Sequence, residues 1–143
     1  MYPFIRLRRK TGVIIISKYL IINADDFGLC HSANEACMEL FESGNLLSST
    51  IMAPCPGADE AIEFAKKHPQ YAIGVHLTHT NEWKDRFPWG PLTDGKSIRT
   101  PEGRMWPESE DFEAHCTYDE ACAETLAQIE YCEKKGMKPS HVD

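Results

Sequence analysis

The chain has 143 residues, which fits one ordinary domain, and its 42% hydrophobic content is enough to build a packed core. The formal net charge of −7 argues against a nucleic-acid partner, because a protein that binds a phosphate backbone needs a basic surface. No apolar run approaches the ~20 residues of a membrane span, and the run at 13–16 is too short for a signal peptide, so we expect no membrane partner.

The first predicted element is a strand. Residues 19–23 form a short apolar, β-branched run that ends in polar residues, a pattern typical of a buried strand. This strand would present Asn23, Asp25 and Asp26 at its carboxyl end.

A helical pattern follows the acidic pair. Ser32 can cap it, Glu35 stands three residues further on as in a capping box, and Gly44 can end it. Its apolar face is formed by Cys37, Leu40 and Phe41.

The middle of the chain alternates strand and helix. Apolar runs and flanking prolines predict, in order, a strand at 49–53, a helix at 58–67 and a strand at 72–77. Residues 80–116 hold all three tryptophans and four prolines without clear periodicity, which indicates a long loop of functional importance.

A strong helix is expected at 118–135, stopped by Gly136, and residues 138–143 read as the start of a fourth strand. Strands that alternate with helices predict an α/β fold with a parallel sheet, in which the carboxyl ends of the strands share one edge.

Unusual polar groups follow these strands. The first carries Asp25 and Asp26, the third carries His76, and the fourth carries His141 and Asp143. One carboxylate and two imidazoles make a standard metal set, and a second carboxylate can take a proton from metal-bound water. Taken singly, an acidic pair often belongs to a turn and a lone histidine is more often structural than a ligand. Their joint placement on successive strand ends favours the metal site.

Four segments resemble, in order, the motifs of the YdjC-like family of carbohydrate deacetylases, which includes chitooligosaccharide deacetylase. They are YLIINADDFG at 19–28, STIMAP at 49–54, GVHLTHT at 74–80 and PSHVD at 139–143. The resemblance implies a (β/α)-barrel-like fold related to polysaccharide deacetylases, incomplete here with about four strands. Residues 18–143 would be the N-terminal part of a single deacetylase domain truncated at its C-terminus. Residues 1–17 have no counterpart, and are either an extension or an artefact of the assigned start codon.

The same resemblance implies a metal-dependent hydrolase that removes the acetyl group from N-acetylated amino sugars or chitooligosaccharides. The divalent metal would be held by Asp26, His76 and His141, with Asp25 as the general base. Family usage implies magnesium, while two imidazoles also suit zinc or another transition metal. His79 stands where the family often has an apolar residue. Because it follows His76 by three positions, on a strand it would face the opposite way, and we expect it not to be a ligand.

The substrate would be a small carbohydrate, and the candidate side chains for its apolar faces are Trp83, Trp89 and Trp106. None of the six cysteines lies in a Cys-x-x-Cys pair, which argues against a zinc knuckle, and we expect reduced thiols in a cytoplasmic protein.

Two alternatives stay open. A truncated barrel has an unpaired strand edge and uncovered apolar surface, so the chain could be an inactive fragment of such an enzyme, a partner-binding piece or part of a homo-oligomer. An acidic pair after the first strand also occurs in receiver-like signalling domains that bind magnesium. Those domains need an aspartate at the end of the third strand, where this chain has His76.

Overall fold

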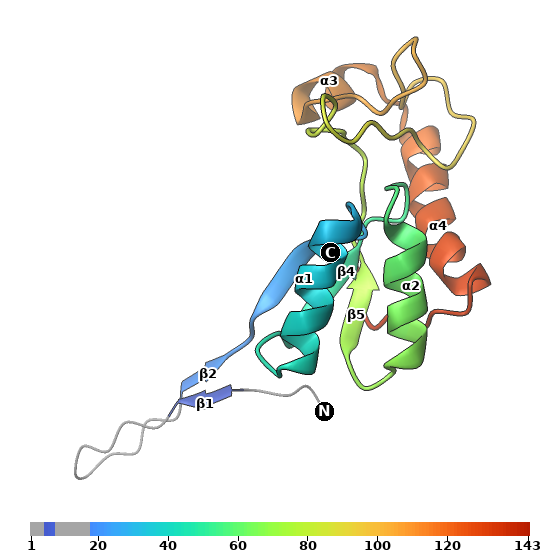
Figure 1. Ribbon diagram of the computed structural model, residues 1–143. Helices are drawn as coiled ribbons and strands as arrows, with labels where there is room; N and C mark the ends of the chain where they lie inside the picture. The colour runs from blue at the N-terminus through green and yellow to red at the C-terminus, as the bar shows by residue number, and fades with distance from the viewer. Residues whose placement is uncertain (1–4, 8–17) are drawn as a thin grey trace.

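The computed structural model describes residues 5–7 and 18–143. Its centre is a parallel sheet with strand order β3-β4-β5 (Figure 1). The three strands are β3 (Asn23–Phe27), β4 (Ser48–Ile51) and β5 (Ala72–Val75). This confirms the predicted α/β class with a parallel sheet.

Helices connect the strands and cover one face of the sheet. They are α1 (His31–Glu42), α2 (Ala58–Lys67) and α4 (Tyr118–Lys134), while α3 (Ser109–His115) lies in the excursion that precedes α4. Side chains from α1, α2 and α4 join one hydrophobic core with alternate residues of the strands, among them Ile51, Ile73 and Val75. Because successive strand residues point to opposite faces, the residues between them, such as Thr50 and Gly74, belong to the face away from these helices.

The predicted strand at 19–23 is wrong in its position. Residues 18–20 form β2 (Lys18–Leu20), which pairs antiparallel with β1 (Ile5–Leu7) and not with the central sheet. Tyr19 is 60% exposed and Ile21 is 56% exposed. The central sheet begins only at Asn23, which is level with Ser48, the first residue of β4. The apolar run therefore lies beyond the central sheet and is largely exposed.

A buried asparagine joins the turns that follow β3 and β4. The predicted cap Ser32 lies inside α1, whose N-cap is Cys30, without a capping bond from a side chain. Asn34 instead accepts a hydrogen bond from the Gly28 N–H (2.7 Å) and donates one to the Gly57 carbonyl (2.9 Å). Because Asn34 is fully buried, both bonds are shielded from water and hold the two turns together.

The long excursion between β5 and α4 is anchored by two buried side chains of α4. Glu124 accepts hydrogen bonds from the backbone N–H groups of Leu92 (3.0 Å) and Thr93 (2.9 Å). Gln128 accepts from the Thr78 N–H (2.8 Å) and donates to the Thr78 carbonyl. The excursion is a loop as predicted, apart from the short helix α3.

The last residues lie beside β5, where the fourth strand was predicted. Val142 forms an isolated parallel bridge with Val75. The Val75 N–H donates to the His141 carbonyl and the Asp143 N–H donates to the Val75 carbonyl, both at 3.0 Å. None of the helices in the described ranges is long and apolar enough to cross a lipid bilayer.

Candidate metal centre

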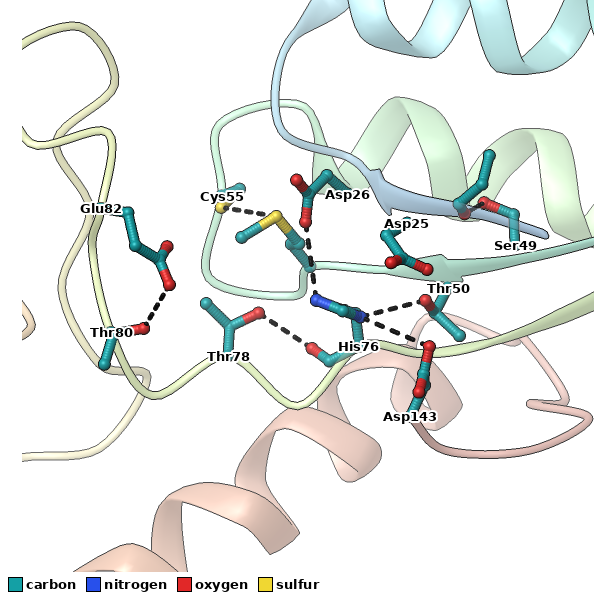
Figure 2. A network of polar contacts seen from close by, with 12 residues as sticks. Asp25, Asp26, Ser49, Thr50, Cys55, His76, Thr78, Thr80, Glu82 and Asp143 are labelled. Carbon is teal, nitrogen blue, oxygen red and sulfur yellow. Dashed lines mark hydrogen bonds and ion pairs between the residues drawn. The ribbon is translucent and has the colours of Figure 1, made fainter. Parts of the chain in front are cut away.

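Acidic and imidazole side chains meet at the carboxyl edge of the sheet. Asp25 lies on β3, His76 directly follows β5, and Asp143 ends the segment beside β5 (Figure 2). Each offers one ligand atom, and the three atoms all lie within 4.8 Å of one another. Two carboxylates and an imidazole could together hold a divalent cation.

The two ring nitrogens of His76 face different partners (Figure 2). Nδ1 lies 3.1 Å from the hydroxyl oxygen of Thr50 and 3.9 Å from Oδ2 of Asp143. Nε2 lies 3.5 Å from Oδ1 of Asp26. The ring is therefore held between carboxylates, and either nitrogen could bind a cation while the other is held in place.

A backbone irregularity brings Asp26 to this ring. The pairing of β3 with β4 shifts register between Ala24 and Phe27, and Asp26 has a φ of 61°. Positive φ in a residue other than glycine costs on the order of 1 kcal/mol, and aspartate tolerates it better than most residues. Since the segment is not regularly extended at this point, the two adjacent acids Asp25 and Asp26 both come close to His76.

The carboxyl group of Asp26 binds its proton more tightly than an exposed aspartate does. Burial raises its pKa, the nearby His76 lowers it, and the negative charges of Asp25 and Glu82 raise it again. A cation beside this carboxylate would favour its ionised form.

The other predicted acid, Asp25, is exposed, and its Oδ1 accepts a hydrogen bond from the side-chain amide of Asn23 (2.6 Å). This bond fixes one carboxylate oxygen and leaves the other free of side-chain partners among the described residues.

His141 lies one step further from the edge. Its Nδ1 is 2.8 Å from the Ser140 hydroxyl, and its Nε2 is 3.5 Å from the hydroxyl of Ser48, the first residue of β4. The group of three that the structure brings together contains Asp143 and not His141. The sequence does contain a signal for Asp143. This residue follows His141 by two positions on an extended segment, so its side chain lies on the same face and one step nearer the carboxyl edge.

A cavity of about 370 Å³ opens beside the Asp26–His76 pair, and its lining includes His79, Glu82 and Trp83. The expectation that His79 faces away from His76 is wrong, because β5 ends at Val75 and the alternation of strand residues ends with it. Both histidines therefore line the same space.

The three tryptophans have three different environments. Trp83 is 44% exposed and lines the cavity beside His76. Trp89 is buried in a second core cluster, where its Nε1 donates to the Thr80 carbonyl (3.1 Å), so its ring is not open to a ligand. Trp106 stacks on His115 with ring centroids 4.0 Å apart, and it lines a different cavity.

Known proteins are similar to this chain in sequence. The family model described as "YdjC-like protein" matches residues 19–143. A carbohydrate deacetylase of Geobacillus stearothermophilus is 32% identical over 88% of this chain and 48% of its own length. A chitooligosaccharide deacetylase of Yersinia enterocolitica is 34% identical over 90% of this chain and 49% of its own.

A solved structure is similar as well. It is described as a putative cellobiose-phosphate cleavage protein of Enterococcus faecalis, and it superimposes with a TM-score of 0.75 at 33% identity. The match covers 86% of this chain and 46% of that one, so the chain spans about half the length of the relatives it matches. The match of the family model over most of the sequence shows that the chain belongs to the YdjC-like protein family.

Proposed function

We propose that this chain carries part of the active site of a metal-dependent carbohydrate N-deacetylase. The relatives named above as carbohydrate and chitooligosaccharide deacetylases support this activity. The observation that carries the proposal is the Asp26–His76 pair, which lines a cavity and has two further carboxylates nearby. The substrates would be N-acetylated amino sugars or chitooligosaccharides.

The donor atoms of this pair fit a cation. Two ligands that bind one metal at about 2.0–2.2 Å with an angle near 90–110° are roughly 3.0–3.5 Å apart. The 3.5 Å between Oδ1 of Asp26 and Nε2 of His76 is within that range, while the wider trio of Asp25, His76 and Asp143 would first have to close. Thr50 and Asp143 then orient the ring through Nδ1. His141 does not enter this set.

The residues that line the site have different roles in amide hydrolysis. A bound cation would polarise the acetamide carbonyl and stabilise the negative charge that develops on its oxygen. Asp25, the exposed neighbour of Asp26, takes a proton from the attacking water. Trp83 offers a partly exposed ring to the apolar face of the sugar. The products are acetate and a free amine.

Magnesium is the proposed metal, from the family resemblance, with zinc as the alternative for a site that contains imidazole. Isothermal titration with Mg²⁺ and Zn²⁺, together with acetate release from N,N′-diacetylchitobiose, tests the proposal. Asp26→Asn and His76→Ala should abolish both cation binding and turnover, while His141→Gln should keep cation binding. If Asp26→Asn bound the cation normally and Asp143→Asn did not, the cation would lie on the Nδ1 side of His76 instead.

A second candidate function is that of a partner-binding piece, and the exposed apolar run favours it. Ile21 and Ile22 are 56% and 37% exposed beside the edge strand β3. Such a surface suits association with another copy of the chain. Light scattering during size-exclusion chromatography tests this, and a monomer that persists at high concentration excludes the homo-oligomer.

A further inference from the structure

Breaking an amide bond requires a proton for the nitrogen that leaves, and no residue has so far been assigned to that step. We infer that His79 donates this proton to the leaving amine nitrogen of the substrate. This inference rests on the proposed deacetylase function. It goes beyond that function because His79 stands outside the predicted metal set and is not required by it.

His79 borders the cavity that opens beside the proposed cation ligands. It lines the same cavity as Asp26 and His76, which are the proposed cation ligands. A sugar whose acetamide reaches those ligands would therefore fill a space that His79 borders. Its own position follows the end of β5 and precedes the loop that carries Glu82 and Trp83.

Two helices hold the imidazole. Its Nε2 lies 3.0 Å from the hydroxyl oxygen of Thr125 on α4. Its ring lies 5.4 Å from that of Phe112 on α3, measured between centroids. A ring that is fixed on two sides can keep one orientation towards a ligand, as a proton donor requires.

The Thr125 hydroxyl suits both protonation states of the ring. A hydroxyl can donate to the neutral Nε2, which then leaves the ring proton on Nδ1, and after rotation it can accept from a protonated Nε2. His79 can thus lose and regain a proton without losing this hydrogen bond. Among the described residues no hydrogen bond to Nδ1 of His79 is formed, so Nδ1 is the nitrogen left to serve the substrate.

The reaction balances with this assignment. Water adds to the acetamide carbon and Asp25 takes its proton. The C–N bond then breaks, and the electron pair on nitrogen takes the proton of the His79 imidazolium. Asp25 releases its proton to solvent, His79 takes one up, and the acetic acid that is formed ionises, so the net change is amide and water to acetate, amine and a proton.

Three other ionisable side chains line the cavity with His79, and their effects on a pH profile must be distinguished from that of His79. They are Asp26, His76 and Glu82. The residues that contact the ring from the helices are Thr125 on α4 and Phe112 on α3, and neither is charged.

The test compares two leaving groups in wild type and His79→Gln. N,N′-diacetylchitobiose releases an amine that needs a proton, whereas p-nitrophenyl acetate releases a phenolate that does not. We expect His79→Gln to lower kcat for the amide by about 100-fold or more and to remove the alkaline limb of its pH profile. The KM and the rate of ester hydrolysis should stay within about two-fold, as should every rate of the control His68→Gln, whose ring packs on Phe64. Equal losses on both substrates, or no loss on the amide, would overturn the inference.

A spectroscopic measurement on the same chain is independent of turnover. Nitrogen-15 NMR of the imidazole should show the neutral ring of His79 protonated on Nδ1, and Thr125→Val should change that tautomer distribution. Glucosamine, which carries the product amine, should shift the His79 ring signals and leave those of His68 in place. A His79 ring that does not respond to glucosamine contradicts the inference. Absence of cation binding by the wild-type chain instead counts against the proposed function.

Discussion

The carboxylate of Asp26 faces the imidazole of His76 across the carboxyl edge of the sheet, with Oδ1 3.5 Å from Nε2. Two local features produce this contact. Asp26 has positive φ within an irregular strand end, and His76 comes directly after the last residue of β5. Burial raises the pKa of Asp26, which destabilises its ionised form, and a cation beside the carboxylate would stabilise that form.

The first prediction concerns the stability of the metal-free protein. Because the folded state raises the pKa of Asp26, the folded state binds the proton more tightly than the unfolded state. The contribution of the Asp26 proton to stability is therefore complete below the ordinary aspartate pKa of 3.8 and is lost as the pH rises through the raised pKa. Asp26→Asn should have a higher Tm than wild type at pH 7 in EDTA, and the difference should shrink towards pH 3.5.

Circular dichroism melts across this pH range check the prediction. Asparagine tolerates positive φ as aspartate does, so the substitution does not add backbone strain. Asp85→Asn, in the exposed part of the excursion, is the matched control for removal of one charge. A Tm for Asp26→Asn below that of wild type at pH 7 would contradict the electrostatic explanation.

The elements of the fold were predicted well from the sequence where a local hydrophobic pattern determines the structure. The predicted helix at 58–67 has the same bounds as α2, because its apolar residues recur on one face and Pro69 follows it. Helix α3 was missed, since none of its residues is buried and no periodic apolar face marks it. The first strand was misplaced because pairing with β4, a long-range interaction, sets where the sheet begins.

The site was predictable in outline. Parallel topology alone gathers Asp25, Asp26 and His76 at one edge. The position of Asp143 relative to His141 depends on how the last segment pairs with β5, and that pairing is decided by tertiary contacts. The shift of register at Asp26 likewise has no sequence signal beyond Gly28, which lies two residues further on. Membership of the YdjC-like family removes the receiver-like alternative.

The second prediction uses the close approach of the last segment to β5. A Cβ atom on Gly74 would lie 2.5 Å from the His141 carbonyl oxygen and 2.9 Å from its Nδ1. Gly74→Ala should therefore displace the last segment and, with it, Asp143. We expect weaker cation binding in titration calorimetry, by about 10-fold. We also expect faster hydrogen exchange at the Asp143 amide, which bonds to Val75.

The control for Gly74→Ala is Ile73→Val on the opposite face of the same strand. It removes one buried methylene from the core and should cost about 1 kcal/mol, and it keeps the backbone hydrogen bond from the Ser140 N–H to the Ile73 carbonyl. If Ile73→Val weakened cation binding as much as Gly74→Ala, the loss would reflect general instability and the steric explanation would fail.

The third prediction concerns the anchor of the excursion. Gln128→Leu keeps the approximate size of the side chain but leaves the N–H and the carbonyl of Thr78 without their partner. Buried groups left unpaired cost about 1–3 kcal/mol each, so the free energy of unfolding in urea should fall by about 2 kcal/mol or more. Leu126→Ala, on the exposed side of α4, should change it by less than about 0.5 kcal/mol. Equal effects of the two variants would refute the role of the buried bonds.

The fourth prediction orders the reactivity of the six free cysteines. A hydrogen bond from the Ser32 side chain lowers the pKa of Cys30, and this thiol is partly exposed. Burial raises the pKa of Cys132 to about 11 and also raises that of Cys55. Because the thiolate is the reactive form, iodoacetamide at pH 7.5 should label Cys30 well before Cys55 and Cys132, as measured by peptide mass spectrometry.

Two controls test this explanation. Ser32→Ala should slow the labelling of Cys30, and unfolding in urea should make the labelling rates of all six cysteines similar. Labelling of Cys132 in the folded chain at the rate of Cys30 would mean that the core around α4 opens readily, against its complete burial here.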